Sequence, residues 1–151
     1  MINASRLQQQ LSAMGHSLLE SFQRDGRRLT RPRKAILAVL ERTRHPMSVA
    51  EIHASLRREK IAVDLVTVYR TLSVFKELGM VSRVEFQEGQ FRYELCQGRE
   101  HHHHIRCRGC GHIADLMLCP LKKIMALVER ETRFLVEDHS LEFIGWCPQC
   151  R

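Results

Sequence analysis

The stretch DLVTVYRTLSVFKELGM, residues 64–80, has the clearest local pattern in the chain. Apolar side chains recur in it at every third or fourth position, which places them on one face of an α-helix. Asp64 is a suitable N-cap for this helix, and Gly79 is a suitable stop. Polar side chains, including Tyr69 and Arg70, are left largely on the other faces. The stretch therefore predicts an amphipathic helix with one buried face. That face consists of Leu65, Val68, Leu72 and Phe75.

Further helices are expected upstream of this stretch. SVAEIHASLRREK, residues 48–60, has Ser48 three positions before Glu51, which is the spacing of a capping box. TRPRKAILAVLERTR, residues 30–44, offers a threonine N-cap and a proline in the first turn. Residues 3–26 are rich in strong helix formers and end in Asp-Gly. Three helices are therefore predicted before residue 64.

Downstream of residue 80 the hydrophobic period changes to two, which is typical of strands. VSRVEF, residues 81–86, and FRYEL, residues 91–95, alternate in this way, and Glu88-Gly89 lies between them where a hairpin turn would sit. The last three helices followed by a hairpin describe a winged helix-turn-helix, whose final helix can enter the major groove of DNA.

The rest of the chain predicts a small mixed α/β unit. Strands are expected in HIADLML, residues 112–118, and HSLEFIGW, residues 139–146, with a helix between them. The polar residues 97–100 form the natural boundary with the first half. The predicted fold class is therefore α+β, with a winged-helix domain and its N-terminal helix over residues 1–96 and a small α/β domain over residues 97–151.

Charge is unevenly distributed along the chain. The net charge is +7, yet residues 1–79 carry 14 basic and 7 acidic side chains, whereas residues 80–151 carry 10 of each. A basic half beside a neutral half indicates that one part meets a polyanion, although a generic basic surface has the same composition. No apolar run approaches the roughly 20 residues that cross a bilayer, and the first residues lack the order of a signal peptide. We therefore expect a cytoplasmic protein that does not enter a membrane.

The cysteines form two Cys-x-x-Cys pairs and two single residues. Cys107 and Cys110 make one pair and Cys147 and Cys150 the other, with 36 residues between the pairs. Two such turns can present four thiolates tetrahedrally, which is the preferred geometry of structural zinc. Two arginines flank the first pair and favour the thiolate form. The pattern favours a structural Zn²⁺ over disulfides or an iron site of the rubredoxin type.

Four consecutive histidines, HHHH, precede the first cysteine pair. In a strand alternate side chains point to opposite faces, so His102 and His104 would share one face and His101 and His103 the other. The run predicts up to two metal sites separate from the cysteines, although an exposed polar run is also compatible with it. Imidazole suits Zn, Fe, Ni and Mn-class ions alike, so the histidines alone do not name the metal.

Taken together, RLTRPRKAIL, LVTVYRTLSVFKELGMV, FRYEL, HHHHIRCRGCG, DHSLEF and CPQC resemble the ferric uptake regulator family of metal-dependent bacterial repressors. The resemblance implies a homodimer with an N-terminal winged-helix DNA-binding domain and a C-terminal dimerisation domain. A regulatory metal would close this dimer onto a palindromic operator in double-stranded DNA. The helix with Thr67 would be the recognition helix, with Tyr69 and Arg70 contacting DNA and Arg28 near the basic position that reaches a minor groove.

The resemblance also implies a regulatory metal site, for which the zinc-type ligand set is the first possibility. In zinc-type members a cysteine before the histidines is a ligand, and Cys96 has the matching spacing of six and eight residues to His102 and His104. Asp115 would complete the set. A soft thiolate selects zinc over iron(II), so this set favours a regulatory Zn²⁺ and a repressor of zinc-uptake genes.

The iron-type ligand set is the alternative. If Cys96 is only a small apolar strand residue, Glu94 and His45 are the corresponding ligands, and Fe²⁺ or Mn²⁺ becomes the expected metal. His45 lies one residue off the usual frame. Asp115 keeps a peroxide sensor open as well, because peroxide sensors of this family use aspartate at that position.

A further metal site is implied by the resemblance, with His101, His103 and His139 as ligands. The family places an acidic residue on the following helix as another ligand, but this chain has Lys122 there. The site is therefore expected to be three-coordinate, completed by water, or absent. Cys119 is expected to be a free thiol at the start of a helix.

An enzyme is the competing class, for instance a zinc hydrolase with an open histidine-rich site. A nucleobase deaminase would need H-x-E followed by P-C-x-x-C, whereas the proline here lies inside Cys147-Pro148-Gln149-Cys150. A catalytic serine–histidine–aspartate order and a glycine-rich phosphate loop are not evident either. The sequence therefore predicts a DNA-binding repressor and not an enzyme.

Overall fold

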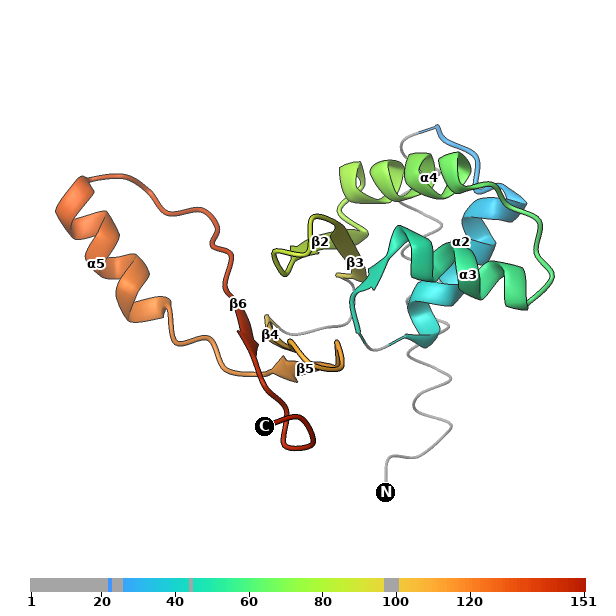
Figure 1. The fold of residues 1–151 in the computed structure, drawn as a ribbon. Coiled ribbons are helices and arrows are strands. Elements are labelled where there is room, and N and C mark those ends of the chain that lie inside the picture. Colours follow the sequence, from blue (N-terminus) through green and yellow to red (C-terminus); the bar gives the residue numbers. More distant parts are fainter. Residues whose placement is uncertain (1–21, 23–25, 44, 97–100) are drawn as a thin grey trace, which may run out of the picture. The chain divides into compact units, whose positions relative to one another are not determined.

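A computed structural model of the chain describes residues 22, 26–43, 45–96 and 101–151 (Figure 1). These residues form two compact units. The first comprises the described residues up to Val84 and those from Gln90 to Cys96; the second comprises Glu85–Gly89 and the residues from His101 onward. Among the described residues, none of the helices has the length and apolar content that crossing a bilayer requires. Most of the helix predicted over residues 3–26 lies outside the described residues.

Three helices of the first unit confirm the expectation from their capping signals. Helix α2 (Arg31–Arg42) follows Thr30 as N-cap and has its proline in the first turn. Helix α3 (Val49–Arg58) begins with the complete capping box of Ser48 and Glu51. Helix α4 (Leu65–Glu77) begins at Asp64, whose Oδ1 accepts a hydrogen bond of 2.8 Å from the backbone N–H of Thr67. Each N-terminus thus has the residue that local chemistry favours.

The core of the first unit forms where α2, α3 and α4 pack on one another. Leu65 differs from the prediction: its side chain is 43% exposed, because the first turn of α4 extends beyond the core. Thr71 is buried instead on the inner face of the helix. Fully or almost fully buried side chains of this core include Phe22, Ile36, Ile52, Leu56, Val68, Leu72, Phe75 and Met80.

A three-stranded sheet completes the first unit as a wing. Strands β2 (Val81–Glu85) and β3 (Phe91–Leu95) are the predicted hairpin, and Gly89 in their connection has the positive φ of 71° that glycine tolerates. A short strand β1 (Met47–Ser48) pairs antiparallel with β3, giving the order β1-β3-β2. Three helices with this sheet make the expected winged helix-turn-helix.

The second unit contains a three-stranded sheet and one helix. Strands β4 (His103–Cys107), β5 (Ile113–Leu116) and β6 (Glu142–Gly145) are arranged in the order β5-β4-β6. Strand β4 pairs antiparallel with β5 and parallel with β6. Helix α5 (Lys122–Thr132) connects β5 to β6 and has no buried residues. The α+β class is therefore confirmed.

Candidate metal centres and nucleic-acid interface

The parallel pairing of β4 and β6 brings the two Cys-x-x-Cys pairs together. Cys107 ends β4 and lies opposite Gly145, the last residue of β6, so both pairs begin at the same end of the sheet. The four sulfur atoms lie within 4.8 Å of one another, and the sulfur atoms of Cys110 and Cys147 are 3.7 Å apart. A tetrahedral zinc with bonds of about 2.3 Å would separate its sulfur ligands by about 3.8 Å. The donor set and its spacing fit this ion.

Glycines shape the turn that carries the first pair. The N–H of Gly111 donates a 3.0 Å hydrogen bond to the carbonyl of Cys107, and its φ of +73° favours glycine. A Cβ on Gly109 would lie 3.0 Å from both Cβ and Sγ of Cys150 and 3.1 Å from the Trp146 ring. The sequence CRGCG therefore leaves room for the second pair to approach the first.

The electrostatics of this cluster favour a bound cation. The pKa of the Cys107 thiol falls to about 6, because the backbone N–H of Cys110 and then that of Cys147 stabilise its thiolate. The Cys147 N–H lies 3.3 Å from that sulfur. The pKa of Cys150 rises to about 12, because its thiol donates hydrogen bonds to Cys147 and Cys110. Without a cation the sulfurs share protons; a dication allows all four to be thiolates.

The histidine run divides between two faces, as its alternation predicts. The His101 and His103 rings lie 4.7 Å apart between centroids, and those of His102 and His104 lie 4.8 Å apart. His139 joins the first pair: its Nε2 is 3.0 Å from that of His101 and 3.4 Å from that of His103. The three histidines predicted for the further site are therefore brought together.

Cys119 is the residue that sequence reasoning missed at this place. It was expected to be a free thiol at the start of a helix. Cys119 is in no disulfide, but it lies before the N-cap of α5, and its Sγ is 3.5 Å from Nε2 of His139 and within 4.8 Å of the donor atoms of His101 and His103. At the position where the family has an acidic ligand this chain has Lys122, whose ammonium group has no lone pair for a metal. Cys119 is the third residue after β5, and only the sheet register brings it back to the histidines. No local signal marks it.

The other face of the run holds a buried histidine beside two carboxylates. His104 is 2% exposed; its Nε2 lies 3.7 Å from Oδ1 of Asp115, and its Nδ1 lies 3.5 Å from Oε2 of Glu142. Asp115 was predicted, and its position opposite His104 follows from the antiparallel β4–β5 register. Glu142 was not predicted, although it faces His104 across the parallel β4–β6 register. A histidine that binds a metal through one ring nitrogen commonly donates its other N–H to a carboxylate. The carboxylates beside His104 could accept such a bond.

The remaining candidate ligands belong to the first unit. Glu94 is buried at the end of β3 and accepts a 3.2 Å hydrogen bond from the hydroxyl of Ser82 on β2. Cys96 follows β3, and its thiol interacts with the same serine. Partial burial raises the Cys96 pKa, the Ser82 hydrogen bond opposes this effect, and the Glu94 charge adds to it. The carboxylate and thiol are thus presented side by side. His45 lies exposed between α2 and β1.

The predicted DNA-contacting side chains lie on the surface of the first unit. Tyr69 is 53% exposed, and Arg70 on the same helix and Arg28 before α2 are also exposed. Thr67 is half-buried, and its hydroxyl donates a 2.7 Å hydrogen bond to Oδ2 of Asp64. The middle of α4 therefore offers an aromatic and a cationic side chain to a partner.

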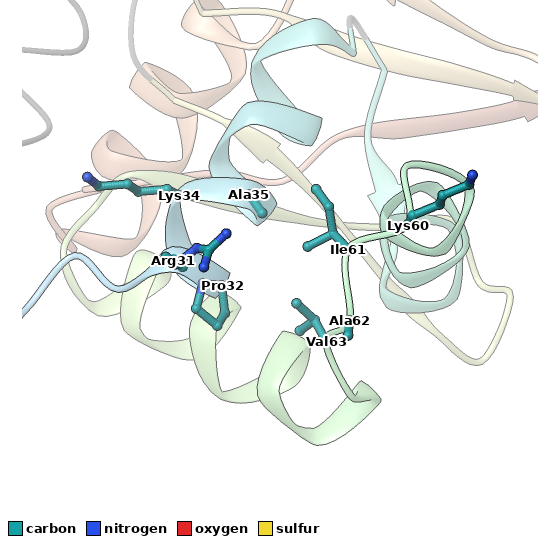
Figure 2. Close-up of a pocket in the computed structure, with 8 residues that line it drawn as sticks. All are labelled: Arg31, Pro32, Lys34, Ala35, Lys60, Ile61, Ala62 and Val63. Atoms are coloured by element: carbon teal, nitrogen blue, oxygen red, sulfur yellow. The ribbon is translucent and has the colours of Figure 1, made fainter.

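A cationic pocket lies next to the start of α4 (Figure 2). Its volume is about 690 Å³, and it opens between the first turn of α2 and the segment that leads into α4. Arg31, Lys34 and Lys60 supply charge, while the other lining residues are apolar. Cations at the surface of a winged helix are suited to phosphate groups of DNA. The apolar lining consists of Pro32, Ala35, Ile61, Ala62 and Val63.

Comparisons with known proteins agree with this arrangement. The sequence pattern of the ferric uptake regulator family matches residues 24–144. The chain belongs to this family. The ferric uptake regulation protein of Legionella pneumophila is 35% identical over 127 residues, which cover 83% of this chain and 93% of that protein. The peroxide-responsive repressor PerR of Staphylococcus aureus is 30% identical over 145 residues, covering 94% and 97% of the two chains.

A solved structure extends the similarity to the whole fold. The Helicobacter pylori ferric uptake regulator, described as having three functional metal binding sites, superposes with a TM-score of 0.77 at 26% identity and covers 93% of each chain. This member of the family is therefore a metal-responsive transcription regulator and not an enzyme. One of the relatives is named for ferric uptake and another for its response to peroxide. Family membership alone therefore does not identify the metal that this chain senses.

Proposed function

We propose that this protein is a zinc-responsive repressor of zinc-uptake genes, which binds a palindromic operator as a homodimer in the cytoplasm. The observation that carries the choice of metal is the thiol of Cys96, which lies beside Ser82 at the end of the wing. Thiolate ligands select zinc over iron(II) and manganese(II), whereas carboxylate and imidazole sites discriminate weakly. A regulatory site that includes this thiol would therefore respond to zinc.

The proposed regulatory ligands are Cys96, His102, His104 and Asp115, the set that the resemblance to zinc-type members implies. His104 supports this assignment, because a 2% exposed imidazole is flanked by two carboxylates. Burying such groups is costly unless charge is balanced, and a divalent cation supplies that balance. Glu142 would then orient His104 through Nδ1 and leave Nε2 to the metal.

We further propose that the four-cysteine cluster holds a structural zinc. Its support is the sulfur spacing described above, together with the hydrogen bonds that stabilise the Cys107 thiolate. A metal bound there supplies folding energy directly and links the ends of β4 and β6.

The homodimer is supported by the surface of the second unit. Helix α5 buries none of its residues, although its apolar side chains give it an amphipathic pattern. A second copy of the chain would remove this apolar surface from water. The exposed apolar side chains of this unit are Ile105, Met117, Leu118, Ile124, Leu127, Val128, Phe134, Leu135, Phe143 and Trp146.

An iron-responsive or peroxide-sensing repressor is the second candidate. Glu94 favours it, because this buried carboxylate lies beside Cys96 around the same Ser82 and is the ligand that iron(II) would prefer. The names of the relatives from Legionella pneumophila and Staphylococcus aureus point in the same direction.

DNA binding under controlled metal separates these candidates. Protein that retains one zinc per chain would be titrated with buffered zinc or with anaerobic iron(II), and binding to operator-type DNA followed by fluorescence anisotropy. Cys96→Ser and Glu94→Gln form the matched pair of variants. We expect zinc to activate binding, Cys96→Ser to abolish this response, and Glu94→Gln to retain it. Activation by iron(II) that depends on Glu94 and ignores Cys96 would overturn the zinc assignment.

A further inference from the structure

The second unit contains another cluster of metal-binding side chains. We propose that it is a closed tetrahedral zinc site in which a thiolate joins three imidazoles. The site lies wholly within the second unit, so it does not rest on which metal the repressor senses. Its ligands are His101, His103, His139 and Cys119.

The three nitrogen–nitrogen distances and the sulfur–nitrogen distance to His139 match the edges of a zinc tetrahedron. Zinc–nitrogen bonds of about 2.05 Å place two nitrogens about 3.3 Å apart, and a nitrogen and a sulfur about 3.5 Å apart. Nε2 of His101 lies 3.2 Å from that of His103 and 3.0 Å from that of His139. Nε2 of His139 is 3.4 Å from that of His103 and 3.5 Å from Sγ of Cys119. Sγ of Cys119 also lies within 4.8 Å of the donor nitrogens of His101 and His103, so the four atoms surround one common position.

Hydrogen bonding among the histidines does not account for this arrangement. A neutral imidazole has one donor and one acceptor nitrogen, and Nδ1 of His103 lies 3.1 Å from the carbonyl oxygen of Leu141. The proton therefore sits on Nδ1, and Nε2 of His103 presents a lone pair. If His101 and His139 both donate to that lone pair, their own contact joins two donors. If only one of them donates, the other contact with His103 joins two lone pairs.

A cation at the centre satisfies every one of these contacts. Each Nε2 then directs its lone pair at the metal, while the Leu141 carbonyl fixes the tautomer and orientation of His103, as a neighbour of a ligating histidine commonly does.

The thiolate decides which cation the site takes. Three imidazoles alone would accept several divalent ions, whereas a thiolate added to them favours zinc over iron(II) and manganese(II). Four protein ligands leave no position open for water or substrate, which is the arrangement of structural zinc. The ligands come from the start of β4, the residues after β5 and the segment before β6. The ion would therefore link the two ends of the segment between β5 and β6, which contains α5.

Site-specific alkylation tests this proposal. Full-length protein that retains one zinc per chain would be pulsed with N-ethylmaleimide before and after further zinc is added, and the peptide with Cys119 quantified by mass spectrometry. Cys119 is half-buried, so part of its surface is exposed to solvent. Added zinc should slow its labelling by about tenfold or more, because metal-bound sulfur is shielded. His139→Ala should restore fast labelling, whereas Cys96→Ser should leave the protection intact.

The outcomes separate this site from the proposed function. Protection of Cys119 that disappears in His139→Ala supports the site, whatever metal controls DNA binding. Equal labelling with and without added zinc would overturn it. Protection that persists in His139→Ala would also overturn it, because the shielding would then arise elsewhere, for example from contact between subunits. As a second readout, Cys119→Ser should bind one fewer zinc per chain, and an unchanged stoichiometry and affinity would refute the thiolate ligand.

Discussion

Replacing Gly109 by alanine should weaken the four-cysteine site without removing a ligand. The added Cβ would lie 3.0 Å from Cβ and Sγ of Cys150, whereas carbon atoms normally approach to about 3.5–4.0 Å. Cys150 would have to move by about 0.5 Å or more, which exceeds the roughly 0.2 Å that a metal–ligand bond tolerates. Overpacking of this kind costs about 1–3 kcal/mol, so zinc should bind about fivefold to 150-fold more weakly.

Competition with a chromogenic chelator measures this loss on protein that holds one zinc per chain. Gly145→Ala is the matched control, because it adds the same methyl group in the same unit and meets only Cδ1 of Ile105 at an ordinary 3.6 Å. We expect Gly145→Ala to bind zinc as the unaltered chain does. If Gly109→Ala also retained full affinity, the close packing of the two cysteine turns would be wrong.

Further predictions concern the first unit and the first cysteine pair. Ser48→Ala should lower the free energy of unfolding by about 1 kcal/mol, measured by urea denaturation, because it removes the cap of α3. Burial tends to raise the Glu51 pKa, but hydrogen bonds from Ser48 and the charge of Arg92 lower it overall. Glu51→Gln should therefore have a lower free energy of unfolding than the unaltered chain at pH 7, and this difference should vanish as the pH falls below 4.5. A difference that does not depend on pH would contradict this. Arg70→Ala should weaken operator binding by about 1–3 kcal/mol in anisotropy titrations with metal content unchanged; a parallel loss of metal would argue against separate roles for the two units. Cys107→Ser should abolish the folded dimer, as measured by sedimentation. A stable dimer of this variant without structural zinc would refute the assignment of that site.

Local chemistry accounts for what could be predicted of the first unit. The capping residues Ser48 and Asp64 act within one turn of the helices they begin, so the sequence alone locates those helices. The exposure of Leu65 could not be predicted in this way, because helical periodicity does not say how far a core extends along a helix. Strand β1 was missed because two residues carry no measurable alternation.

Pairing between distant segments explains what was missed in the second unit. The Cys-x-x-Cys spacing marks four residues as a set wherever the chain places them. Cys119 and Glu142 have no such spacing, and they reach His139 and His104 only through the loops and register of the β5-β4-β6 sheet. The alternation of the histidine run gave the two faces correctly, but it could not say which other residues each face would meet.

The parallel pairing of β4 and β6 allows a metal at the cysteine pairs to cross-link the two ends of the segment between them. A clamp at the cysteine pairs closes a loop of 36 residues, and closing a loop of that length removes about 4 kcal/mol of unfolded-chain entropy at room temperature. The loop carries α5, whose apolar side chains are the surface available to a second copy. Loss of the metal would therefore destabilise the fold of the second unit, and with it the surface available to a second copy. The winged-helix core contains none of these cysteines and would keep its fold.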